Sequence, residues 1–197
     1  MRSLRRTRSQ SGVSLVAFYR GLAPGGCGAT IDEILSWDDE RLERVHDYIQ
    51  WLFPLSSRSR AVPEAPVLDG EQIDTFRSSQ ELRSKLEAAL DRMLSFYGLR
   101  RIDEGSGPRV ERSASFDERA RTWLYPRNHN FLRLTRILTS LRLLGLPKHS
   151  DALFQALESI YLERPEAIGA TTFEFWKNSS PVVTETTRAA RRPPSAR

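Results

Sequence analysis

The sequence has a single cysteine, Cys27, and this scarcity excludes any disulfide bond within the chain. It also lacks an apolar run of the roughly 20 residues that a membrane-spanning helix needs. The Arg-rich start carries one apolar stretch, Val13–Phe18, which Ser14 interrupts and which is too short for a secretory signal. A lone thiol is typical of a reducing compartment. We therefore expect a soluble protein in the cytoplasm.

The motifs of common catalytic and metal sites are missing as well. None of the three histidines lies in a HExxH or CxxC setting, and the glycines before Thr30 are not followed by the GK[ST] of a phosphate-binding loop. No GxSxG or SxxK motif supports a nucleophile. We expect no metal, no cofactor and no enzyme activity. The alternative of an unrecognised enzyme requires a deep pocket in which His46 or His129 has a perturbed pKa.

The positive charge of the chain is concentrated at its two ends. Residues 1–20 carry +5 and residues 177–197 carry +4, so subtracting both from the net charge of +5 leaves −4 for the body. We predict a disordered basic tail over 1–16, a folded domain over 17–177, and a disordered Pro- and Arg-rich tail over 178–197. Such tails suit weak, salt-dependent contact with nucleic acid, or they are simply solvated.

The pattern of apolar residues predicts helices throughout the body. With 39% hydrophobic and 28% charged residues, 197 residues are enough for one domain. Capping boxes start helices at Thr30–Glu33 and Asp69–Gln72. No alternating β-branched run is present, and the polar segment 101–113 is predicted as a mobile loop. We expect an all-α fold, a single layered domain of roughly six to eight helices. Apolar spacing places helices at about 39–53, 78–97, 116–124, 129–144, 150–164 and 165–176.

Two helical segments are more polar than a core requires. His46 and Gln50 are four residues apart and share one helix face, and His129, Arg133 and Arg136 form a cationic line near a helix start. A carboxylate or phosphate would be favoured there. The alternative is that the arginines pair with acids of the first helices and the histidines bond to backbone carbonyls. The predicted ligand- or partner-binding residues are His46, Gln50, Trp51, His129, Asn130, Arg133 and Arg136.

The same segments carry a family resemblance. In order, they are 18–21 (FYRG), 31–35 (IDEIL), 46–55 (HDYIQWLFPL), 93–99 (MLSFYGL) and 129–138 (HNFLRLTRIL). Together they closely resemble the conserved N-terminal domain of the opioid growth factor receptor family. Only three of the 30 basic residues are lysine, which suggests a GC-rich genome and hence a short bacterial member.

The resemblance implies a receptor-type domain. Animal members are described as receptors for the pentapeptide Met-enkephalin that act at the nuclear envelope and in the nucleus. We therefore expect a non-catalytic domain that binds a peptide or a protein partner. The alternatives are a nucleic-acid-associated protein acting through its tails and the unrecognised enzyme. If His46 and His129 converge in space, the two polar segments form one site.

Overall fold

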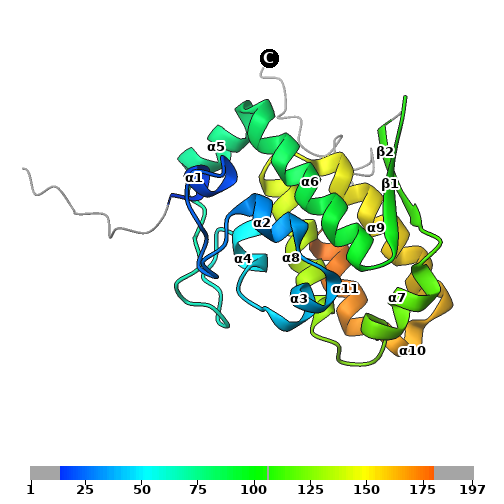
Figure 1. Cartoon of the computed structure of the whole chain (residues 1–197). Coiled ribbons are helices and arrows are strands. Elements are labelled where there is room, and N and C mark those ends of the chain that lie inside the picture. Colours follow the sequence, from blue (N-terminus) through cyan, green and yellow to red (C-terminus); the bar gives the residue numbers. More distant parts are fainter. Residues whose placement is uncertain (1–13, 106, 180–197) are drawn as a thin grey trace, which may run out of the picture.

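The computed structural model describes residues 14–105 and 107–179, and in it short helices surround a few long ones, with a β-hairpin at one side (Figure 1). The strands are β1 (Leu99–Glu104) and β2 (Gly107–Arg112). The helices in these residues are α1 (Leu15–Tyr19), α2 (Ile31–Ser36), α3 (Asp39–Arg44), α4 (Ile49–Leu52), α5 (Gly70–Ser78), α6 (Gln80–Phe96), α7 (Phe116–Trp123), α8 (Asn130–Leu143), α9 (Pro147–Glu163), α10 (Pro165–Ile168) and α11 (Ala170–Ser179).

The long helices make the framework on which the rest is placed. Helices α8 and α9 pack on each other, and α11 packs on both. Helices α1, α2 and α5 pack on α6 (Figure 1). The apolar face of α8 is buried, and each such side chain contributes about 1.5–3 kcal/mol. Two indole nitrogens fix this core further, since Trp123 donates to the Tyr97 carbonyl and Trp176 to the Phe131 carbonyl. Helix α8 is therefore held firmly at the centre.

The all-α prediction is wrong, because residues 99–104 and 107–112, most of them predicted as a mobile loop, pair as two antiparallel strands. Strand β1 packs on α6 and strand β2 on α9. Arg101 shares the packed face with buried Leu99 and Val110, and its guanidinium binds Asp91 of α6 at 2.8 and 2.9 Å. Each strand has only one buried apolar residue on that face. The alternation of apolar and polar residues that predicts a strand is therefore too weak to recognise in the sequence. The Arg101–Asp91 salt bridge takes the place of a second apolar contact between β1 and α6.

The helix count is also wrong, since the described residues contain eleven helices instead of six to eight. The single helix predicted over 39–53 is broken at residues 45–48, where Val45 is extended. The helix predicted over 165–176 is broken at Gly169, whose φ of +79° is unfavourable for other residues. Both predicted capping boxes are confirmed, at Thr30–Glu33 and at Asp69–Gln72.

The described helices begin at Leu15 and end at Ser179. Most of the two predicted tails, residues 1–13 and 180–197, therefore lie outside the described residues. None of the helices in the described part of the chain is both long and apolar enough to cross a membrane.

Candidate functional site

The two polar segments predicted from the sequence meet in space. The rings of His46 and His129 lie 5.4 Å apart, centroid to centroid. Between α8 and residues 45–61, a groove of about 400 Å³ opens to solvent; we call it the α8 groove. Its lining residues are His46, Ile49, Gln50, Leu55, Arg58, Ser59, Arg60, Ala61, His129, Leu132, Arg133, Thr135, Arg136 and Thr139.

Five of the seven predicted residues line the α8 groove, and Trp51 and Asn130 do not. The Trp51 ring packs under the backbone of Gly25 and Gly26, where an added Cβ would lie 3.0 and 2.8 Å from it. It also meets the Phe18 ring edge-on at 5.3 Å. Asn130 is fully buried behind the groove. Both residues are buried and absent from the lining, so neither is placed to contact a ligand in the groove.

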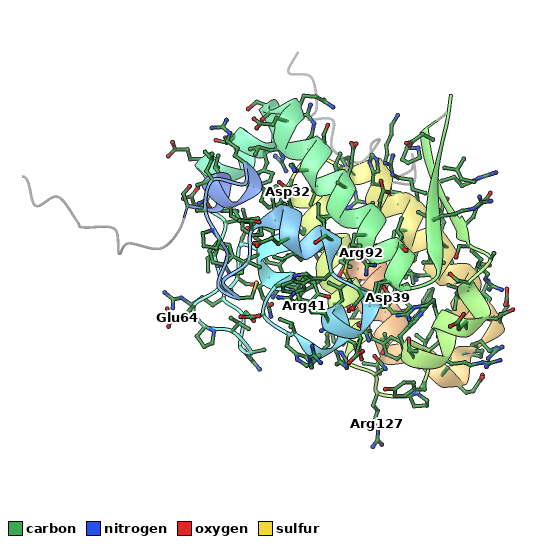
Figure 2. All side chains as sticks on the ribbon, in the orientation of Figure 1. Asp32, Asp39, Arg41, Glu64, Arg92 and Arg127 are labelled. Atoms are coloured by element: carbon green, nitrogen blue, oxygen red, sulfur yellow. The ribbon has the colours of Figure 1, made fainter. Side chains whose placement is uncertain are left out.

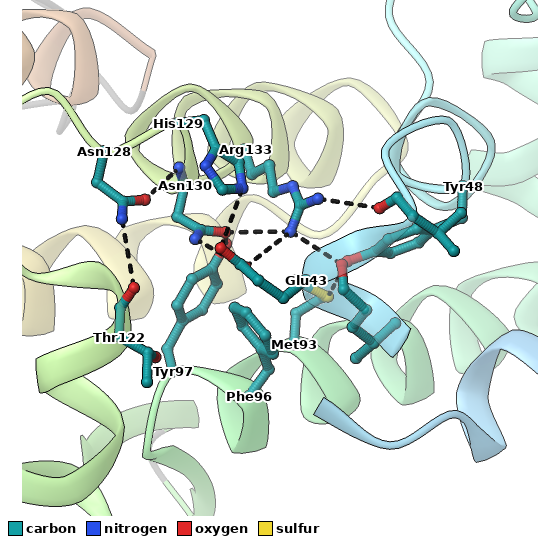
Figure 3. Close-up of polar contacts among 12 residues, drawn as sticks. Glu43, Tyr48, Met93, Phe96, Tyr97, Thr122, Asn128, His129, Asn130 and Arg133 are labelled. Carbon is teal, nitrogen blue, oxygen red and sulfur yellow. Dashed lines mark hydrogen bonds and ion pairs between the residues drawn. The ribbon is translucent and has the colours of Figure 1, made fainter. Parts of the chain in front are cut away.

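Arg133 joins α8 to the break between α3 and α4 (Figure 3). Its Nη1 donates to the Leu42 carbonyl at 3.1 Å and its Nη2 to the Val45 carbonyl at 3.0 Å. The side chain is only 5% exposed and lies 3.6 Å from the Glu43 carboxylate. In an unbroken helix the Leu42 carbonyl would accept from the amide of His46. Arg133 takes the place of that amide and so stabilises the break.

Asn130 completes this arrangement, which we call the Arg133 junction (Glu43, Asn130, Arg133 and the two carbonyls). Its Oδ1 accepts from Arg133 at 3.2 Å and from the Tyr97 hydroxyl at 3.4 Å, and its Nδ2 donates to Glu43 at 3.1 Å (Figure 3). The side chain of Asn128 accepts from the Asn130 amide at 2.8 Å. Helix α8 itself begins at Asn130, with His129 at the N-cap position and no capping bond from the His129 side chain.

His129 lines the α8 groove and also lies beside the Arg133 junction. Its Nε2 is buried without a hydrogen-bond partner, 3.4 Å from a Glu43 oxygen (Figure 3). Burial lowers the pKa of His129, and the positive charge of Arg133 lowers it further, while Glu43 acts in the opposite direction. The imidazole is thus held in its neutral form. A further negative charge brought beside it would raise its pKa.

Gln50 and the break above it form the other wall. Gln50 is buried, and with its amide nitrogen turned to the backbone it donates to the carbonyls of His46 and Asp47 at 3.1 Å each. The break between α3 and α4 leaves backbone carbonyls without helical partners, and the side chains of Arg133 and Gln50 donate hydrogen bonds to them. The alternative that an arginine pairs with an acid of the first helices holds for Arg133, which lies 3.6 Å from Glu43 of α3.

Arg136 differs from these residues. Its Nη1 donates to the Phe53 carbonyl at 3.2 Å, and no carboxylate of the described residues lies within ion-pair distance of it. Burial of the guanidinium lowers the pKa of Arg136. Arg58 and Arg60 are exposed and face the same groove. None of the lining residues is Asp or Glu, so the α8 groove has an unbalanced positive charge.

The sequence reasoning missed Glu43, Arg58, Arg60 and Leu132. A signal for the two arginines was present, because residues 48–63 contain them and no acid. The same holds for Leu132, an apolar residue that is 72% exposed beside polar neighbours. Glu43 had no such signal, as it is one of several acids on a charged helix.

The groove contains no arrangement typical of catalysis or metal binding. The hydroxyls of Thr135 and Thr139 donate to backbone carbonyls of α8, and Ser59 Oγ accepts from the amide of Val62. The hydroxyl protons of Thr135 and Thr139 are therefore bound by backbone carbonyls and not by a base. Within the part of the chain that the structure describes, no group of three or more His, Cys, Asp or Glu residues is placed to hold a metal ion.

Comparison with known proteins gives a consistent picture. The family model of the opioid growth factor receptor conserved region matches residues 10–188. The chain is 44% identical to the opioid growth factor receptor of Homo sapiens over 161 residues, which are 78% of this chain and 23% of that protein. It is 37% identical over 150 residues to the opioid growth factor receptor-like protein 1 of Mus musculus, covering 74% and 32% of the two chains. The chain spans about a quarter to a third of the length of these relatives. No solved structure matches it.

Proposed function

Because the chain belongs to the opioid growth factor receptor family, we propose that it is a non-catalytic, receptor-type domain that binds a short peptide in the α8 groove. Met-enkephalin, the ligand that the family resemblance implies, is the first to test. A cytoplasmic location is part of the same proposal. The matched segments are only 23% and 32% of these relatives, so their activity as whole proteins comes to this chain only as a proposal.

The observation that carries the proposal is the convergence of two segments from distant parts of the sequence. Residues 46–61 and 129–139 come together and leave a groove of about 400 Å³, within the range of roughly 300–1,000 Å³ for small-ligand sites. Apolar side chains and cations line it together, and Leu132 stands exposed at its edge. Leu132, Arg58 and Arg60 are exposed, so burial in the core does not account for them.

The absence of catalysis is inferred from how the polar groups are used. The pKa of His129 is perturbed, as the enzyme alternative requires, but its neighbours explain the shift without a reaction. The groove is also open to solvent, and its hydroxyls serve the backbone. Binding is therefore the simplest use of the site.

The test is fluorescence anisotropy of labelled Met-enkephalin titrated with the full chain, beside a scrambled peptide. We expect saturable binding of the true peptide with a Kd near or below about 1 μM, roughly −8 kcal/mol. No binding of either peptide would remove the enkephalin reading. Nucleic acid that copurifies and is lost at high salt, or on removal of 1–16 and 178–197, would favour the tail-based alternative.

A matched pair of leucine variants locates the site. Leu132→Ala removes exposed apolar surface from the groove, and we expect a loss of about 1–2 kcal/mol in peptide affinity. Leu162→Ala removes a leucine that is 74% exposed on α9 and does not line the groove, so affinity should not change. Equal affinities for both variants would place the peptide elsewhere.

A further inference from the structure

The α8 groove has more positive charge than its own structure uses. Four arginines and two histidines line it, and none of its lining residues is acidic. The Arg133 guanidinium is bonded on both sides by the Arg133 junction. Arg136 uses one nitrogen for the Phe53 carbonyl, and Arg58 and Arg60 point from the opposite wall with no ion pair to a described residue. Three guanidinium groups therefore remain for an anion.

Apolar surface lies directly beside these cations. Ile49 and Leu55 line the wall that includes α4, Ala61 follows the two arginines, and Leu132 lies one helical turn before Arg136 on α8. The ligand that matches this lining carries one negative group next to an apolar side chain. The volume of about 400 Å³ is at the low end for ligand sites and suits the end of a chain.

The lining argues against single-stranded nucleic acid as the occupant. Proteins that bind single strands stack bases on aromatic side chains, and none of the lining residues is Phe, Tyr or Trp. A carboxylate matches the fork of an arginine in two parallel bonds. The C-terminus of a peptide combines such a carboxylate with an adjacent apolar side chain, and capture of peptide ends is a known mode of recognition.

We propose that the α8 groove recognises the free C-terminal carboxylate of a short peptide, with Arg136 on one wall and Arg58 and Arg60 on the other as its ligands. This inference rests on the proposed peptide-binding function and adds its ligand chemistry. Leu132, Leu55 and Ile49 would then contact the last apolar side chain of the peptide. An uncharged or blocked end loses the charge-assisted bonds and is rejected.

The experiment compares Met-enkephalin with its C-terminal amide on the full chain, by isothermal titration calorimetry. We expect the free acid to bind at least about tenfold tighter than the amide, since charge-assisted hydrogen bonds are roughly twice as strong as neutral ones. In Arg58→Gln/Arg60→Gln that preference should fall to about threefold or less, and Arg58→Lys/Arg60→Lys, which keeps the charge but lacks the planar fork, should keep only part of it.

A charge-matched control separates the groove from general attraction. Arg121→Gln/Arg127→Asn removes two exposed arginines that do not line the groove. Arg127 points away from the body (Figure 2), and Asn tolerates its φ of +64°. We expect the control to keep the preference for the free acid. Equal loss in both double variants would overturn the proposal, because the attraction would then depend on net charge alone.

A second arm keeps the inference testable if enkephalin is the wrong peptide. A random hexapeptide library is offered with free C-termini and, separately, amidated. Enrichment of free-acid peptides alone supports the carboxylate site even where enkephalin does not bind, so the enkephalin assignment then fails by itself. Equal binding of acid and amide overturns the inference and leaves peptide binding standing. Enrichment that follows acidic or phosphorylated side chains, or no enrichment in either library, also overturns it.

Discussion

Arg133 and Arg136 lie one turn apart on α8 and read alike in the sequence, but the structure uses them differently. Arg133 is buried in a junction where two carbonyls, an amide and a carboxylate surround it. Arg136 makes one bond to the Phe53 carbonyl and otherwise faces the α8 groove. The same residue type thus completes the fold at one position and remains available for a ligand at the next.

The difference lies in what each arginine faces across the interface. Arg133 faces the broken end of α3, whose carbonyls need donors. Arg136 faces the end of α4, where its guanidinium donates to the Phe53 carbonyl. The neighbouring Leu52 carbonyl already accepts a hydrogen bond from the Tyr19 hydroxyl. Unpaired backbone groups therefore decide which cation becomes structural. The predictions below test this distinction, starting with the largest expected effect.

Arg133→Met should cost about 3 kcal/mol in the free energy of unfolding, because two carbonyls and Asn130 each lose a charged donor and Glu43 loses an ion-pair partner. Methionine keeps much of the apolar stem, so the loss reports the guanidinium. Urea unfolding followed by circular dichroism measures it. A loss below about 1 kcal/mol would mean that water replaces the guanidinium, and the junction would then not be what holds the break.

Asn130→Ala should cost about 2 kcal/mol in the same measurement. The variant leaves the Tyr97 hydroxyl and one face of Arg133 without a partner in a buried position, and it removes the bond to Glu43. Asn178→Ala, at an exposed position of α11, is the matched control and should change stability by less than about 0.5 kcal/mol. Similar losses in both variants would argue against a role for Asn130 in the junction.

Arg136→Met should cost only about 1 kcal/mol in stability, as expected for one hydrogen bond to a backbone carbonyl. The same variant should weaken peptide binding more than it weakens the fold. Urea unfolding and peptide titration on one preparation give the two numbers. A loss of stability equal to that of Arg133→Met would remove the contrast between the two arginines.

The smallest expected effect concerns His129. Its folded pKa lies below its usual value of about 6.5, so the unfolded chain takes up a proton more readily than the folded one. Its contribution is therefore present above about pH 6.5 and is lost as the pH falls through the folded pKa. Unfolding at pH 7.5 and 5.0 should show a smaller drop in stability for His129→Gln than for the parent chain. An identical drop would assign the pH dependence to other groups, such as His149, whose pKa is lowered by burial.

The strongest sequence signals gave correct elements of the fold. Capping boxes at Thr30 and Asp69 and apolar periodicity in α6 and α8 depend on neighbours within one or two turns, and such signals can be read locally. The hairpin could not be read, because Arg101 occupies a packed position through an ion pair with Asp91 of another element. The break at Val45 was missed for the same reason, since its partner Arg133 lies far along the chain.

The candidate site was predicted as a set of residues and not as a geometry. Spacing on a helix places His46 with Gln50 and His129 with Arg133 and Arg136, and the structure brings these five to one groove. Trp51 and Asn130 were included because they adjoin polar residues in the sequence, although neighbours on a helix point about 100° apart. Burial against Gly26 and Glu43 decides their roles, and sequence spacing contains no information about that burial.

The bonds of Arg133 also set an order of events in time. Its two carbonyl partners lie 91 and 88 positions earlier in the chain. During synthesis, the segment that contains Leu42 and Val45 therefore leaves the ribosome long before Arg133 is added. Until then, only water can donate hydrogen bonds to those two carbonyls. Contacts of such sequence separation close late in folding. A nascent or proteolysed chain that stops before residue 133 lacks most of α8 and therefore has no groove to offer a peptide.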